Sequence, residues 1–197
     1  MDSRSRFLDL ALQNPVIVAV LERAPALGVP DWWLAAGALS QTVWNVLHGR
    51  DPGAGIADYD LVYFDDTDLS YDAENTVIGR ATEVLGDVAP SLEIRNQARV
   101  HLWYQTHFGE PGLRFTSSTH AIDHFPTTTT SVGLSRTAGG EFTVYAPFGL
   151  DDILAMRVRP NPRLAPRTVY ETKTRRWKAE WPNLLVEPWP EPDDRAG

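Results

Sequence analysis

The sequence predicts an α+β fold, a mixed α/β arrangement in which helices flank a small central mixed β-sheet. Strand-like segments alternate with helical periodicity up to residue 108, and a hairpin followed by further helices comes after Gly109. The 197 residues are 43% hydrophobic, enough for one core. We expect a single domain over residues 1–190, with N-terminal helices in 1–30, a core in 31–160, a C-terminal helix in 168–182 and an extended or disordered tail in 187–197.

Two short helices are predicted before residue 30. Asn14 is suited to an N-cap and Pro15 to a first helical position, at the point where the apolar spacing restarts. The next segment, "DWWLAAGAL" (31–39), passes from apolar residues into a turn at Gly37. In "SQTVWNVLHG" (40–49) apolar residues then recur at helical spacing before Gly49, a typical helix end. The segment therefore predicts a strand, a turn and a helix.

The same order repeats further along the chain. A loop rich in Gly and Pro leads into "DYDLVYFD" (58–65), a strand rich in β-forming residues. An amphipathic helix is expected in "YDAENTVIGRATEVLGD" (71–87), a short strand in "SLEIRN" (91–96) and a helix in "QARVHLWYQTHF" (97–108). The two predicted strands are separated by one helix, so they can lie side by side in the sheet.

The last third of the chain predicts a hairpin and two helices. Two β runs meet at Gly139-Gly140 within "SVGLSRTAGGEFTVYAPFG" (131–149), which is typical of a hairpin. The segments "LDDILAMRVRP" (150–160) and "YETKTRRWKAEWP" (170–182) are interpreted as helices that end at prolines. The final "EPWPEPDDRAG" is acidic and rich in proline, which is typical of an extended or disordered tail.

Composition narrows the classes of function. The formal net charge is −8, which disfavours sequence-independent binding to a nucleic-acid backbone. A small molecule is therefore the expected partner. Cysteine is absent, which excludes disulfides, thiolate metal sites and thiol nucleophiles and favours the cytoplasm. The sequence contains neither a secretory leader pattern nor an apolar run of about 18 residues, so we expect no membrane association.

The strand "DYDLVYFD" carries the central functional hypothesis. Residues two apart in a strand share a face, so Asp58 and Asp60 project together. Adjacent carboxylates repel, and a hard cation such as Mg²⁺ or Mn²⁺ relieves that repulsion while keeping positions open for water and phosphates. A third carboxylate on a neighbouring strand commonly completes such a site. Glu93 in "SLEIRN" is the candidate. The pattern indicates metal-assisted nucleotidyl transfer.

The turn before the helix is the candidate phosphate site. A turn of small residues lets backbone N–H groups approach phosphate oxygens at a helix N-terminus. Gly37, Ala38 and Ser40 are the residues of this site, and the hydroxyl of Ser40 could bind a terminal phosphate. Arg99 and Arg95 are candidates to add positive charge, and a solvated surface position is the alternative for both.

These motifs resemble the nucleotidyltransferase superfamily of DNA polymerase beta. The similarity to a bacterial nucleotidyltransferase-like family, formerly a domain of unknown function, is closer. It runs through most of the chain, in "AGALSQTVWNVLHG", "DYDLVYFD", "IRNQARVHLWY" and "APFGLDDILAMRVRPNP". The resemblance implies a DNA polymerase beta-like fold, metal-binding and catalytic roles for Asp58, Asp60 and Glu93, and phosphate binding around Gly37.

Other polar clusters allow simpler interpretations. Asp58 and Asp60 could form a solvated strand face. His120 and His124 are spaced like zinc ligands, but no Glu follows the first His and the surroundings do not secure a helix. A structural role is favoured for Thr127–Thr130. The C-terminal tryptophans are expected in the core, with base stacking as the alternative, and the basic residues of 173–178 on a solvated face, with phosphate binding as the alternative.

The primary hypothesis is a Mg²⁺-dependent (or Mn²⁺-dependent) nucleotidyltransferase. It would move a nucleoside monophosphate from a nucleoside triphosphate to a hydroxyl of a small-molecule acceptor and release pyrophosphate. The alternative is a catalytically silent nucleotide-binding or interaction module with the same fold. That alternative is motivated by Gly37-Ala38, which stands where the superfamily usually has Gly-Ser or Gly-Gly. An antibiotic-modifying or toxin-like transferase would share the chemistry and differ in its acceptor.

Overall fold

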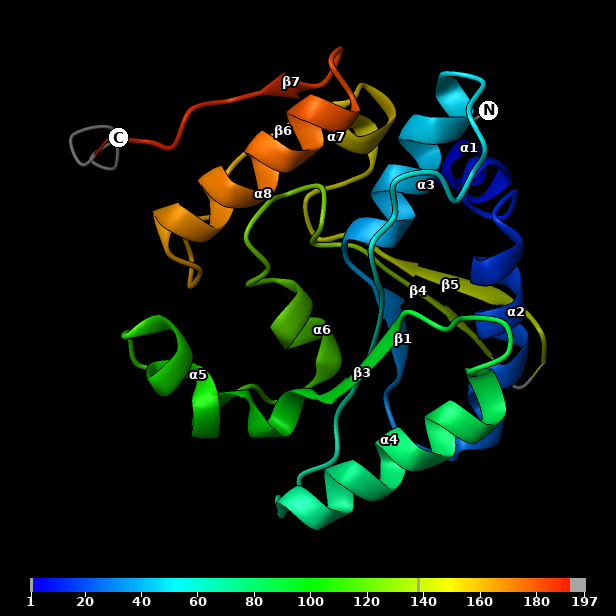
Figure 1. Cartoon of the computed structure of the whole chain (residues 1–197), viewed down its shortest axis with the longest axis vertical. Helices are drawn as coiled ribbons and strands as arrows, with labels where there is room; N and C mark the ends of the chain where they lie inside the picture. The colour runs from blue at the N-terminus through cyan, green and yellow to red at the C-terminus, as the bar shows by residue number, and fades with distance from the viewer. Residues whose placement is uncertain (1, 138, 192–197) are drawn as a thin grey trace.

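A five-stranded mixed sheet forms the centre of the molecule (Figure 1). The structure is a computed structural model that describes residues 2–137 and 139–191. The spatial strand order is β3-β2-β1-β4-β5, with β2 and β3 parallel and the other neighbours antiparallel. The strands are β1 (Trp33–Ala35), β2 (Tyr59–Tyr63), β3 (Leu92–Asn96), β4 (Gly133–Arg136) and β5 (Phe142–Tyr145). This arrangement confirms the predicted fold class.

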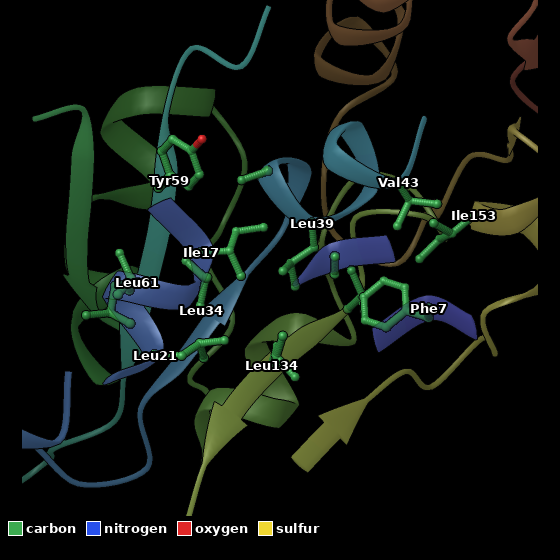
Figure 2. Close-up of a cluster of buried hydrophobic side chains, with 14 of the residues drawn as sticks. Phe7, Ile17, Leu21, Leu34, Leu39, Val43, Tyr59, Leu61, Leu134 and Ile153 are labelled. Carbon is green, nitrogen blue, oxygen red and sulfur yellow. The ribbon is translucent and has the colours of Figure 1, made fainter. Parts of the chain in front are cut away.

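Helices cover both faces of the sheet. The N-terminal helices, α3 and α4 pack on the face that carries Leu34, Leu61 and Leu134, and this face forms the main core (Figure 2). The other face carries Ala35 and Val62, which pack against Ile122 of α6. The helical segments are α1 (Ser3–Ala11), α2 (Pro15–Arg23), η1 (Ala24–Leu27), α3 (Gly37–Leu47), α4 (Tyr71–Leu85), η2 (Gln97–Arg99), α5 (Val100–Phe108), α6 (Ser118–Ile122), α7 (Asp151–Leu154) and α8 (Arg167–Glu180).

The predicted helix over residues 150–160 is wrong in its second half. The helix α7 ends at Leu154, and Met156 adopts a left-handed conformation with φ of 54°. That backbone geometry is incompatible with a continuing α-helix. The chain instead forms β6 (Arg157–Val158), which pairs in parallel with β7 (Leu185–Val186).

The chain after β7 continues without helix or strand as far as residue 191. Glu187 donates its backbone N–H to the Val158 carbonyl at 2.9 Å, and the Trp189 ring lies 5.7 Å from that of Tyr170. These contacts tie the beginning of the expected tail to β6 and α8. Residues 192–197 of that tail lie outside the described residues.

Asn14 links the N-terminal helices to the sheet. As predicted, it is the N-cap of α2, and its Oδ1 accepts the N–H of Val16 at 2.9 Å. Its amide nitrogen donates to the Thr42 hydroxyl of α3 and to the Tyr59 hydroxyl of β2, each at 3.0 Å. The side chain is fully buried, so these hydrogen bonds do not compete with bulk water. One residue therefore fixes α2, α3 and the start of β2 relative to one another.

We expect Asn14→Ala to destabilise the protein by about 2–4 kcal/mol, since it removes a helix cap and leaves buried hydroxyls without their partner. Urea denaturation measures the change. Gln13→Ala is the matched control, because the Gln13 amide donates only along its own helix end, to the Asp9 carbonyl. Equal losses in the two variants would contradict the linking role of Asn14.

Candidate active site

The sheet register brings residues of three strands into one row. Asp60 of β2 is paired with Ala35 of β1 on one side and with Glu93 of β3 on the other. Asp58 precedes β2 by one residue and lies two positions before Asp60, on the same side of the chain. Tyr59 and Leu61 alternate with the two acids and are buried in the main core. The strand thus directs its carboxylates away from the main core.

Those carboxylates reach a cavity of about 270 Å³. Its walls come from the turn before α3, from β2 and β3, from α5, from the region of α6 and from α8, the helices that surround this face of the sheet (Figure 1). One end is acidic, with Asp58, Asp60 and Glu93. Much of the remaining lining is aromatic and aliphatic, including Trp103, Tyr104, Phe108, Phe115, Phe125 and Leu164, of which Tyr104, Phe108, Phe115 and Leu164 belong to one apolar cluster. A cavity with a charged end and an apolar part suits a ligand that combines phosphates with a ring.

Asp60 is the most perturbed acid in the cavity. Its pKa is raised from 3.8 to about 7, first because burial disfavours the charged form and next because the Asp58 charge repels it. Lys173 opposes this shift, Glu93 adds to it and Arg95 opposes it, so these charges lie within electrostatic reach of Asp60. A largely desolvated carboxyl beside like charges is typical of a functional site.

Glu93 lies at the exposed edge of the same row. Its carboxylate is 3.9 Å from the Arg95 guanidinium, and both side chains are about half exposed. Over residues 2–137 and 139–191, no group of three or more His, Cys, Asp or Glu side chains is arranged to hold a metal ion. Glu93 therefore does not form a three-carboxylate centre with the aspartates in this structure. Asp58 and Asp60 still fit Mg²⁺, which proteins often bind through one or two carboxylates together with substrate phosphates.

The turn between β1 and α3 borders the cavity beside Asp60. Ala36 adopts φ of 62° and ψ of −142°, a conformation that residues other than glycine rarely adopt. Its N–H donates to the Val132 carbonyl at 3.1 Å, which helps to hold the turn. In the described part of the chain no side chain caps α3. The first N–H groups of this helix lack intrahelical acceptors, so its N-terminus favours an anion.

Only one of the three predicted turn residues lines the cavity. Gly37 does so, and a Cβ there would lie 2.5 Å from Gln41 Nε2, so the close packing of Gln41 over the turn relies on the glycine. Ala38 is fully buried in the main core. Ser40 is also fully buried, and its hydroxyl donates to the Thr129 carbonyl. The Ser40 side chain is directed to the buried segment 127–131 by this hydrogen bond.

The structure also places Arg99 away from the cavity. Its guanidinium pairs with Glu74 of α4 and donates to the Leu69 carbonyl at 3.1 Å. Both charged side chains of this pair are only about one tenth exposed, so the ion pair holds α4 against the end of η2 and the start of α5. Arg95, the other arginine considered from the sequence, lines the cavity.

Helix α8 contributes basic residues for which the sequence favoured a solvated face, with phosphate binding as the alternative. Lys173, Arg176 and Trp177 line the cavity, and their spacing of three and four residues places them on one helix face. Arg175 and Lys178 instead border a separate groove beside β7. The basic face predicted to be solvated is therefore divided. The helical spacing could have revealed the division, but nothing local indicated that α8 lies opposite the acids.

The remaining polar clusters have mainly structural roles. Thr127, Thr129 and Thr130 are buried and connect their hydroxyls to one another, as the structural interpretation predicts. His124 lines the cavity, with Nδ1 2.8 Å from the His120 carbonyl oxygen. The described residues contain no zinc-like cluster around these histidines.

A mixed sheet with paired aspartates beside the uncapped start of a helix is consistent with the nucleotidyltransferase class. A family model described as nucleotidyltransferase matches residues 22–186, and the chain belongs to that family. A solved structure described as an NMR structure that reveals a CCA-adding enzyme head domain is similar, with a TM-score of 0.76 and 28% sequence identity. The similarity covers 93% of this chain and 95% of that one. A search of curated proteins found no match. Among the described helices, none has the length and apolar character needed to cross a membrane.

We expect Asp60→Asn to stabilise the protein without divalent cations. Because the folded-state pKa of Asp60 lies above its ordinary value, the native protein loses stability from this group as pH rises from about 4 to 7. The gain at pH 7.5 should be roughly 2–4 kcal/mol, given about 1.4 kcal/mol per unit of pKa, and should vanish near pH 3.5. Urea denaturation at the two pH values measures it. The exposed Asp66→Asn is the control, and a pH-independent effect of Asp60→Asn would contradict the assignment.

Proposed function

We propose that the chain is a Mg²⁺-dependent nucleotidyltransferase, with Mn²⁺ as a possible substitute, that joins a nucleoside monophosphate to the hydroxyl of a small-molecule acceptor. The observation that carries the proposal is the position of Asp58 and Asp60 in the cavity beside the uncapped start of α3. Carboxylates suited to a hard cation and a helix terminus suited to an anion meet there. A metal nucleoside triphosphate has both features.

Asp58 and Asp60 would hold the metal ion, and Glu93 would complete the site from β3 by turning from Arg95 toward the aspartates. When bound, Mg²⁺ supplies charge neutralisation at the triphosphate and eases ionisation of the attacking hydroxyl. The acceptor oxygen forms a bond to the α-phosphorus, the bond from that phosphorus to the β-bridging oxygen breaks, and pyrophosphate leaves. Glu93 is the base proposed for the hydroxyl proton, since it is exposed at the cavity edge and aligned with Asp60.

The phosphates would be bound by two elements. The N-terminal turn of α3 at Gly37 offers backbone N–H groups, and Lys173 and Arg176 offer positive charge from the opposite wall. Ser40 and Arg99 are left out of this site, because Ser40 is engaged with Thr129 and Arg99 with Glu74. Positioning and fixed charges would then account for most of the acceleration.

A catalytically silent nucleotide-binding module is the second candidate. Two observations favour it: Ala38 is a buried core residue without a hydroxyl, and Glu93 pairs with Arg95 at the exposed edge. Calorimetry with each nucleoside triphosphate and Mg²⁺, followed by pyrophosphate release across a panel of hydroxyl acceptors, separates the two functions. Binding with no release for any acceptor would favour the module.

We expect Asp60→Ala to lower pyrophosphate release by roughly 10²-fold or more, because metal binding and transition-state charge stabilisation both rely on this carboxylate. Mg²⁺-dependent nucleotide binding should weaken with it, while circular dichroism shows an intact fold. Asp66→Ala, which removes an exposed acid outside the cavity, should keep full activity. Unchanged release by Asp60→Ala would refute the mechanism.

Lys173→Ala should weaken triphosphate binding by roughly tenfold, since it removes a cation that faces the phosphates. The salt dependence of binding should become shallower in the same variant, because one fewer charge is screened. Arg175→Ala removes a charge from the same helix on the side of the other groove and is the control. Comparable weakening by the two variants would indicate a general charge effect.

A further inference from the structure

Two side chains that line the cavity each carry an unpartnered polar atom. In the described part of the chain, Gln41 Oε1 and Trp177 Nε1 are buried atoms without a hydrogen-bond partner. Both side chains line the cavity, and each is only 1% exposed. Leaving a buried donor or acceptor unsatisfied costs about 1–3 kcal/mol. Native structures rarely keep two such groups in one place without a reason.

The contacts of Gly37 show that Gln41 and Trp177 lie near Asp60. A Cβ at Gly37 would lie 2.5 Å from Gln41 Nε2 and 3.9 Å from Trp177 Cζ2, so both side chains meet over this glycine. Gly37 follows Ala35 by two residues, and Ala35 is the strand partner of Asp60. The other buried unpartnered side-chain atoms of the described chain, on His101 and Thr128, belong to residues that do not line the cavity.

The chemistry of the two groups selects their ligand. The indole N–H of Trp177 can only donate, and Gln41 Oε1 can only accept. With the Gln41 amide as it stands, an ionised phosphate oxygen would satisfy Trp177 but has no hydrogen for Oε1, and it could pair with Gln41 only if the amide turned to present Nε2. A hydroxyl group satisfies both, since it accepts from Trp177 and donates to Gln41.

We infer that Gln41 and Trp177 together bind one hydroxyl of the nucleotide sugar and thereby select ribonucleotides over their deoxy forms. This inference rests on the proposed function. If the α-phosphate lies at Asp58 and Asp60 and the outer phosphates at the first N–H groups of α3, the sugar, joined to the α-phosphate through its 5′-oxygen, can reach Gln41 and Trp177 beside Gly37. Loss of the sugar hydroxyl leaves the two buried groups unpaired again, which is the basis on which polar sites reject analogues.

The test measures the affinity of the full-length protein for each nucleoside triphosphate and for its 2′-deoxy and 3′-deoxy forms, by calorimetry with Mg²⁺ and no acceptor. We expect the wild type to bind a ribonucleotide at least about fivefold more tightly than one of the two deoxy forms. In Gln41→Leu and Trp177→Phe this ratio should fall toward one, because the ribonucleotide loses affinity and the deoxy form does not.

Thr128→Val is the matched control, since it removes a buried unpartnered hydroxyl from a residue outside the cavity and should leave the ratio unchanged. Thermal unfolding checks that Trp177→Phe keeps its packing. Equal binding of all three forms by the wild type, or a ratio that survives in both variants, would overturn the inference and leave the proposed function standing. If no triphosphate binds the wild type, the proposed function fails and the inference with it.

Discussion

The pairing of β2 between β1 and β3 is the constraint on which the site depends. Asp60 pairs with Ala35 on one side and Glu93 on the other, so a shift of β2 or β3 by one residue would move an acid to the wrong face. The register is held by the alternating residues of the same strand. Tyr59, Leu61 and Tyr63 are buried in the main core, and Asn14 binds the Tyr59 hydroxyl. The hydrophobic face of β2 thus sets the position of its carboxylates.

This arrangement holds the Asp60 carboxylate at a position that lowers the stability of the fold. Burial and the charge of Asp58 raise the pKa of Asp60 to about 7, so its ionised form opposes the folded state at neutral pH. Ala36 adds backbone strain at the neighbouring turn. The core on the opposite face offsets both costs. Sites with such local conflicts are where function, rather than stability, explains the residues.

The features of the site that depend on residues close together in the sequence could be predicted, because local rules determine them. The period of two in a strand places Asp58 and Asp60 together, and Asn14-Pro15 marks the start of α2. Ser40 and Arg99 illustrate what local rules miss. Their side chains are directed by Thr129 and Glu74, which lie 89 and 25 residues away in the chain. The same holds for Met156, whose left-handed backbone interrupts a segment of good helical pattern.

The basic wall of the cavity shows why tertiary packing decides the remainder. Helix α8 is fixed to α3 through tryptophans, since the Trp44 ring lies 5.8 Å from that of Trp177 and 5.5 Å from that of Trp181, both edge to face. Trp177 takes part in this packing and also lines the cavity. The contact that anchors α8 therefore determines the position of Lys173, one turn earlier, relative to the acids. Of the C-terminal tryptophans expected in the core, Trp177 and Trp181 are buried there, and Trp189 packs against it partly buried. That core contact also orients a wall of the cavity. In α8, structural and candidate functional residues are therefore not separate sets, and the sequence alone could not show this.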